Sequence, residues 1–219
     1  MSVKIYSIQP YDHKAEIEQF EKVSQVLVEQ DGHAFNQAIL IGNFNIGGVE
    51  LDALLITNNY VAILEFKNWG GNIIAGENGN WTSDGLTIEG GAGGKSPYYQ
   101  IKLNRSRTTG ELKRLLSKPD LYNVKGVIIF RQNAAIDDHH ISEPVKKWLR
   151  ICDNQTLSEV LLGCCEATIF TPSEMESIPE LLGVQRFIIS DIGRAETVSG
   201  NIPRPAYGQE SALSFFDEL

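Results

Sequence analysis

Two apolar runs rich in β-branched residues dominate the pattern in the first third of the chain. They cover residues 49–57 and 60–67, and Asn58-Asn59 separates them. Asparagine adopts left-handed turn conformations readily, and an apolar run on each side of such a pair is typical of a β-hairpin. The pattern therefore predicts two antiparallel strands joined by a tight turn.

Four charged residues interrupt these runs at their outer ends. Side chains alternate across a strand, so Glu50 and Asp52 share one face of the first arm, and Glu65 and Lys67 share one face of the second. The turn sets the register, and this register brings the four residues together at the open end of the hairpin. The sequence thus predicts three acids and one lysine at one edge of a buried sheet.

Clustered carboxylates repel one another, so either their pKa values rise or a cation lies between them. A hard, oxygen-liganded ion such as Mg²⁺ or Mn²⁺ suits Asp52 and Glu65 best. Lys67 would then orient or help to deprotonate water in a metal-assisted hydrolysis. The alternative is a sheet-edge ion pair of Lys67 with Glu65 or Glu50 that has no catalytic role.

Helical and strand-like spacing of apolar residues continues along the chain. It predicts an α/β fold in which a mixed sheet has helices on both faces. The predicted helices cover residues 14–30, 98–116, 145–150, 155–163 and 173–182, and the predicted strands cover residues 34–47, 71–75, 80–83, 124–130 and 166–171. Asp137-Asp138-His139-His140 has the residue types of a metal site, but adjacent side chains point apart, so we expect an exposed polar loop there.

Two polar residues on the predicted helices are candidates to join the charged cluster. Glu21 lies at the margin of the apolar stripe of the first helix, so it is the acid of that helix most able to reach the sheet edge. Gln100, on the second long helix, has the amide needed to hold a water or a phosphate oxygen. Its alternative role is that of an ordinary surface amide.

Length and composition favour one large domain with a short extension. The chain has 219 residues, of which 42% are hydrophobic, and this is enough for a substantial core. No apolar run approaches the roughly 18 to 20 residues that cross a bilayer, so we expect a cytoplasmic protein without a membrane partner. We assign residues 1–200 to the domain and residues 201–219 to a linker and an apolar tail of the kind that leads to a further domain in a longer protein.

The net charge of −9 argues against a surface that binds nucleic acid everywhere. Between residues 95 and 118, however, seven basic residues stand against the single acid Glu111. A basic element of this kind tracks a phosphate backbone, whereas the alternative is a solvated helix face. The candidate nucleic-acid-binding residues are Lys95, Lys102, Arg105, Arg107, Lys113 and Arg114.

Several short motifs follow one another along residues 21–130. They are Glu21-x-x-Ser24, Glu50-x-Asp52, Glu65-Phe66-Lys67, Asn68-x-Gly70, Pro97-x-x-Gln100 and the strand Val124-x-Gly126-Val127-Ile128-Ile129-Phe130. In this order the motifs resemble the nuclease-related domain (NERD) of the PD-(D/E)xK nuclease superfamily. The resemblance implies a restriction-endonuclease-like αβββαβ core with a C-terminal extension. Ser96 departs from it, because the family usually has an asparagine before this proline.

The resemblance also implies roles for residues at matching positions. Asp52, Glu65, the backbone carbonyl of Phe66 and Glu21 would bind Mg²⁺ or Mn²⁺, and Lys67 and Gln100 would act beside them on water. The implied activity is hydrolysis of DNA phosphodiester bonds, by an endonuclease or an exonuclease with little sequence specificity, and RNA is the alternative substrate. The competing hypothesis is a catalytically idle adaptor that binds nucleic acid or a helicase or kinase partner, fused or separate.

Overall fold

The computed structural model describes residues 2–30, 36–90, 96–131, 133–164 and 167–184. The predictions for Lys95, for the division at residue 200 and for the tail lie outside these residues. A six-stranded mixed sheet and a separate four-stranded sheet form the framework, and the predicted α/β class is confirmed.

The large sheet has the strand order β1-β2-β3-β4-β8-β10. The neighbours β2, β3 and β4 pair antiparallel, whereas β1 with β2, β4 with β8, and β8 with β10 pair parallel. Its strands are β1 (Ser2–Ser7), β2 (Gln37–Ile46), β3 (Val49–Thr57), β4 (Val61–Lys67), β8 (Val124–Phe130) and β10 (Leu149–Asp153). Every residue of β4 and β8 is buried, as expected for strands that have layers on both faces.

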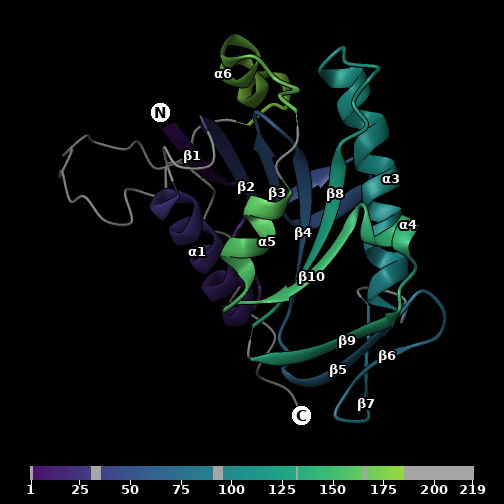
Figure 1. The fold of residues 1–219 in the computed structure, drawn as a ribbon. Coiled ribbons are helices and arrows are strands. Elements are labelled where there is room, and N and C mark those ends of the chain that lie inside the picture. The colour runs from purple at the N-terminus through teal and green to yellow at the C-terminus, as the bar shows by residue number, and fades with distance from the viewer. Residues whose placement is uncertain (1, 31–35, 91–95, 132, 165–166, 185–219) are drawn as a thin grey trace, which may run out of the picture.

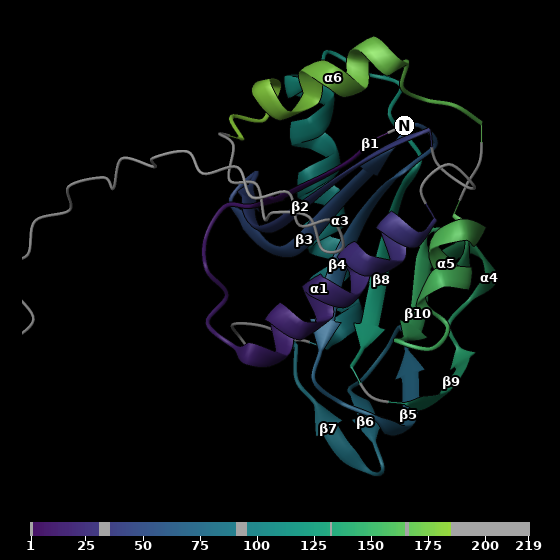
Figure 2. The ribbon, with the colours of Figure 1, turned by 90° about the vertical axis from the view of Figure 1, so that its left-hand side faces the viewer.

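Helices cover both faces of the large sheet (Figures 1 and 2). One face packs against α3 (Pro97–Leu115), and its core includes Leu54, Ile56, Val61 and Ile63. The other face packs against α1 (Lys14–Glu29) and α5 (Leu157–Gly163). The order α1, β2, β3, β4, α3, β8 matches the αβββαβ core that the sequence resemblance implies.

The four-stranded sheet lies at one end of the large sheet, and α6 (Pro172–Leu181) lies at the other (Figure 1). The strand order of this four-stranded sheet is β7-β6-β5-β9. A short helix, α4 (Glu143–Lys146), follows β9. The strands are β5 (Gly71–Gly76), β6 (Trp81–Ser83), β7 (Leu86–Ile88) and β9 (Ala134–His140). None of the described helices is long and apolar enough to span a membrane.

The predicted hairpin is confirmed, but its turn differs from the expected one. Neither Asn58 nor Asn59 has a positive φ angle. Instead, the backbone N–H of Thr57 donates to the carbonyl of Tyr60 at 2.9 Å. Asn58 is buried, and its Oδ1 accepts a hydrogen bond from the N–H of Gln37 at 2.7 Å. This asparagine therefore links the turn to the start of β2, and a left-handed backbone is not required.

Three other predictions were wrong. Asp137-Asp138-His139-His140, expected to be an exposed polar loop, belongs to β9, because residues 134–140 pair parallel with β5. Residues 167–171 form no strand, and they lead instead to the capping box of α6 at Thr171. The helix predicted over residues 145–150 is shorter, since α4 ends at Lys146 and β10 begins at Leu149. β9 and β10 depend on strand partners distant in the sequence, whereas the capping box of α6 is a local contact between Thr171 and Glu174.

Candidate active site

The site begins where β3 and β4 separate. Their last paired residues are Ala53 and Leu64. Beyond this pair, a side chain of β3 replaces the backbone ladder: Oδ2 of Asp52 accepts a hydrogen bond from the N–H of Phe66 at 2.6 Å. The N–H and C=O of one strand residue point to the same side of the strand, so the carbonyl of Phe66 faces the same gap as Asp52.

Lys67 is the central cation of the site. Its Nζ donates to Oε1 of Glu65 at 2.8 Å and to Oε1 of Gln100 at 3.2 Å. Glu65 is 2% exposed and Lys67 is 8% exposed, so this ion pair lies almost entirely out of solvent. Gln100 reaches it from the first turn of α3, where its N–H donates to the carbonyl of Ser96. The structure thus brings together Asp52, Glu65, Lys67 and Gln100 from three elements.

Burial dominates the electrostatics of the two acids. It raises the pKa of Asp52 well above its usual range, and the charge of Glu65 raises it further, against the opposing effects of the Phe66 N–H and of Lys67. Burial also raises the pKa of Glu65, while Lys67 opposes the shift and Glu16 adds to it. Two carboxylates that disfavour each other's charge in this way would be stabilised in their ionised forms by a cation between them.

Glu16, in the first turn of α1, is the acid of this helix that faces the site. It lines the cleft beside Asp52, and burial raises its pKa while nearby His13 opposes the shift. Glu21 is exposed and does not line the cleft. Five residues along an α-helix turn the side-chain direction by about 140°, so the two acids cannot share one face. The apolar stripe of α1 did not identify Glu16 as a site residue. The position of Glu16 in the first turn of the helix is the signal that could have identified it.

The cleft itself has a volume of about 570 Å³ and lies between the start of α1, the β2–β3 turn and α3. Tyr11 forms part of its wall, and its hydroxyl donates to the backbone carbonyl of Asp52 at 2.6 Å. Sequence analysis did not identify Tyr11 or His13. The lining residues that carry a charge or an amide are Asp12, His13, Glu16, Asn43, Glu50, Asp52, Gln100, Asn104 and Arg107.

The basic residues of α3 do not form a single stripe toward this cleft. Arg107 lines the cleft, and its Nη1 donates to the carbonyl of Gly48 at 3.4 Å. Arg114 pairs instead with Glu111 on the helix surface. Of the predicted nucleic-acid-binding residues in the described part of the chain, Arg107 is therefore the one that lies at the site.

The other three cations of α3 lie on aromatic rings. Lys102 Nζ is 5.4 Å from the ring centre of Tyr98, and Lys113 Nζ is 4.1 Å from that of Tyr122. Arg105 stacks on Trp148. Spacing in the sequence could not reveal the contacts of Arg105 and Lys113, because their aromatic partners come from other segments, whereas Lys102 and Tyr98 are four residues apart on α3.

The oxygen donors at the site match the chemistry of a hard divalent cation. Two carboxylates and one backbone carbonyl offer the ligand type that Mg²⁺ and Mn²⁺ prefer, and Mg²⁺ commonly binds through one or two carboxylates while keeping several waters. Among the described residues, no group of three or more His, Cys, Asp or Glu side chains is close enough to hold a metal by itself.

Comparison with known families bears on this geometry directly. The model of the nuclease-related domain, NERD, matches residues 13–131. This chain belongs to the NERD family. The match covers α1 to β8 and includes Glu16, Asp52, Glu65, Lys67 and Gln100, so the NERD assignment and the geometry concern the same part of the chain. A search of the curated proteins and a search of the solved structures gave no match.

The NERD assignment confirms the resemblance seen in the sequence and supports a nuclease-like function at the level of the family. It also suggests interaction with nucleic acid and the use of a divalent metal. It covers none of β9, β10, α5 and α6, which complete the sheets and their outer layers in this NERD protein.

Proposed function

We propose that this protein is a divalent-metal-dependent nuclease that hydrolyses DNA phosphodiester bonds with little sequence specificity. The observation that carries the proposal is the Lys67 ammonium, which is held between Glu65 and Gln100 beside Asp52 inside the NERD match. A surface ion pair would not need a buried lysine, a second carboxylate at the same strand end and an amide from another element.

Asp52, Glu65 and the backbone carbonyl of Phe66 are the proposed ligands of Mg²⁺ or Mn²⁺. Glu16 replaces Glu21 as the proposed acid from α1, because it lies at the cleft and its charge affects both Asp52 and Glu65. When bound, the ion supplies positive charge beside the phosphate and lowers the pKa of coordinated water. The N–H of Phe66 holds Asp52 in place for this role.

Lys67 is proposed to orient the attacking water and to stabilise the charge that develops on the phosphate oxygens. Its two hydrogen bonds, to Glu65 and Gln100, restrain the ammonium and leave its third proton for a substrate or water oxygen. Gln100 thus positions Lys67. Arg107, on the same cleft, is placed to contact a backbone phosphate, and such contacts carry no sequence information.

Plasmid cleavage tests the assignment. Supercoiled and linear DNA would be incubated with the full chain and Mg²⁺ or Mn²⁺, since nicking of the closed circle separates endonuclease from exonuclease activity. We expect Asp52→Asn and Lys67→Met to lower the rate at least a hundredfold, as is usual for loss of an electrostatic group at a reacting phosphate. Wild-type activity in both variants would refute the proposal.

Paired variants on α1 distinguish the two candidate acids. Glu16→Gln removes one charge from the cleft, whereas Glu21→Gln removes the same charge from the outer face of the same helix. We expect the first variant to weaken cleavage and to require more Mn²⁺. The reverse result would show that Glu21 is the ligand after all.

The adaptor hypothesis has a separate test. Calorimetric titration of the full chain with Mn²⁺ should give heat that Asp52→Asn abolishes. If the wild type binds no Mn²⁺ at millimolar levels and cuts no DNA, the domain is an adaptor, and its predicted helicase or kinase partner becomes the question.

A further inference from the structure

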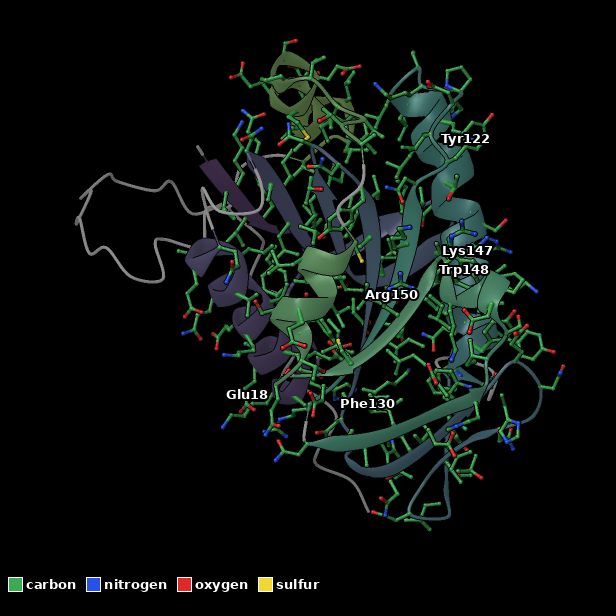
Figure 3. All side chains as sticks on the ribbon, in the orientation of Figure 1. Glu18, Tyr122, Phe130, Lys147, Trp148 and Arg150 are labelled. Carbon is green, nitrogen blue, oxygen red and sulfur yellow. The ribbon has the colours of Figure 1, made fainter. Side chains whose placement is uncertain are left out.

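A second hollow, distinct from the active-site cleft, lies on the other side of α3. It has a volume of about 320 Å³ and is formed by α3, the start of β8 and the segment between α4 and β10. We call it the α3–β8 pocket. Its lining residues are Arg105, Tyr122, Asn123, Val124, Lys125, Lys147 and Trp148. Figure 3 shows Tyr122, Lys147 and Trp148 along the α3 side of the molecule.

The charge of this pocket is opposite to that of the protein and of the cleft. Three of its seven lining residues are cations and none is an acid, in a chain of net charge −9. The cleft, in contrast, is lined by four acids, Asp12, Glu16, Glu50 and Asp52, with Arg107 as its arginine. A polyanion is therefore attracted to the α3–β8 pocket and repelled by the metal-free cleft.

Two of the neighbouring cations are held in place by aromatic rings. The guanidinium carbon of Arg105 lies 4.7 Å from the ring centre of Trp148, and its Nε donates to the carbonyl of Val124 at 2.6 Å. Lys113 Nζ lies over the ring of Tyr122. Neither forms an ion pair with an acid among the described residues, and the same is true of Lys147.

Lys125 has a different part in the pocket. Its side chain is buried, and its Nζ donates to the backbone carbonyl of Lys147 at 3.0 Å. It thereby holds the chain segment that carries Lys147 and Trp148 against the start of β8. Lys147 itself is exposed.

Tyr122 supplies a flat apolar surface beside these cations. Its side chain is 74% exposed, more than that of any other large hydrophobic residue in the described part of the chain. Exposed aromatic rings set among cations are the means by which proteins bind single strands, since bases stack on the ring while phosphates contact the cations. An acidic protein segment would use the cations but would gain little from the ring.

We propose that the α3–β8 pocket binds single-stranded nucleic acid. A base stacks on Tyr122, and the adjoining phosphates contact Arg105, Lys113 and Lys147. Gln100 lines the cleft and Arg105 lines the pocket, and the two residues are five apart on α3, which is a rise of about 7.5 Å and a rotation of about 140°. The pocket and the cleft therefore lie on different sides of the same part of α3. The idea that the pocket delivers a strand to the cleft rests on the proposed nuclease function, whereas the binding of single strands by the pocket does not.

Fluorescence anisotropy in EDTA measures this binding without cleavage. The probe is a fluorescein-labelled oligothymidylate, with an oligouridylate as the RNA arm, and the protein is the full chain at low salt. We expect Tyr122→Ala to raise the Kd about fivefold or more, which is the usual effect of losing one stacked base, and Tyr122→Phe to preserve it. Because Tyr122 is exposed, neither change threatens the fold.

The phosphate interactions have their own signature in the salt dependence of binding. Removal of one cation that neutralises a phosphate of a single strand reduces the slope of log K against log salt by about 0.7, so Lys147→Ala should flatten the salt dependence by this amount. Lys22→Glu is the matched control for Lys147→Glu, because Lys22 lies on α1, on the opposite face of the sheet. Only the change at Lys147 should weaken binding severalfold beyond the effect of net charge.

The proposal is overturned if Tyr122→Ala binds as tightly as the wild type, if Lys22→Glu weakens binding as much as Lys147→Glu, or if oligoglutamate displaces the probe as well as unlabelled oligothymidylate does. These outcomes concern only the binding of single strands, so the plasmid-cleavage test of the nuclease proposal is independent of them. Conversely, a wild type that cuts no DNA but loses binding in the Tyr122→Ala and Lys147→Glu variants would refute the nuclease and retain the pocket.

Discussion

Lys67→Met should expose the energetic role of the buried ion pair. The substitution keeps the length of the side chain but removes the ammonium that Glu65 accepts from at 2.8 Å. Glu65, which is 2% exposed, would then be a buried carboxylate without its cation. In metal-free buffer such a group escapes the cost of an unpaired charge by taking up a proton.

The size of the effect follows from this proton uptake. Burial already raises the pKa of Glu65 above its usual value of 4.5, and Lys67 is the first influence that opposes the rise, so its removal raises the pKa further. A carboxyl that stays protonated in the folded state while the unfolded chain ionises near 4.5 lowers the free energy of unfolding as the pH rises above that value. Removing one partner of a buried ion pair typically costs roughly 3 to 5 kcal/mol, and we expect a loss of this order at pH 7.

The sign of the pH dependence follows from the raised pKa. In the variant, the folded state binds a proton that the unfolded state releases above pH 4.5, so stability is greatest below that pH and falls as pH rises. The loss of stability relative to the wild type should therefore be larger at pH 7 than at pH 5.

Urea unfolding in EDTA at pH 5, 6 and 7 measures these values, and Glu65→Gln/Lys67→Met is the matched control. The double variant has neither charge, so it should recover most of the lost stability and lose the pH dependence. A Lys67→Met penalty that does not change between pH 5 and pH 7, or that remains in full in the double variant, would refute the electrostatic account.

Three further predictions concern the packing and the hydrogen bonds of the fold. In Gly126→Ala the new Cβ would lie 2.7 Å from Cγ1 of Ile101 on α3, so we expect a loss of about 1 to 3 kcal/mol in urea unfolding and slower cleavage, and unchanged stability would contradict this packing. Asn58→Ala removes the acceptor for the N–H of Gln37 and the donor to the carbonyl of Phe170. Thermal unfolding should show a loss of about 1 to 3 kcal/mol, and a Tm equal to that of the wild type would count against this prediction. Hydrogen bonds, first of all the one from Lys118, lower the pKa of Glu174 to about 2. Glu174→Gln should therefore destabilise the protein above pH 4.5 and progressively less as the pH falls toward 2. An equal loss of stability at pH 3 and pH 7 would contradict this prediction.

The hairpin and its charged end could be predicted from the sequence because they depend on local rules. A period of two placed Asp52 on the same face as Glu65 and Lys67, and the turn set the register, and both results are confirmed in the strand pairing and on the α3 face. The long helices and β8 were predicted for the same reason, since amphipathic spacing records which side of an element is buried.

Strands whose burial pattern is weak were not predictable in this way. Residues 134–140 alternate between half-buried and exposed side chains, and their pairing with β5 joins segments more than sixty residues apart. The strand β10 similarly depends on its pairing with the distant β8, whereas β5 and β6 of the separate sheet were predicted from their local pattern.

By itself, the sequence determined the α/β core and the family, because both follow from apolar spacing and from an ordered set of motifs. It also placed Asp52, Glu65 and Lys67 together and named Gln100 as a candidate beside them, and the structure brings these side chains together. Only the tertiary structure decided which acid of α1 faces the cleft. The apolar residues of a helix fix its rotation about its own axis only approximately, so they do not show which polar residue beside them faces a neighbouring element. The tertiary structure also decided that the cations of α3 divide between an acidic cleft and a basic, aromatic pocket. Both outcomes depend on how α1 and α3 pack on the sheet, and the packing partners come from distant parts of the chain.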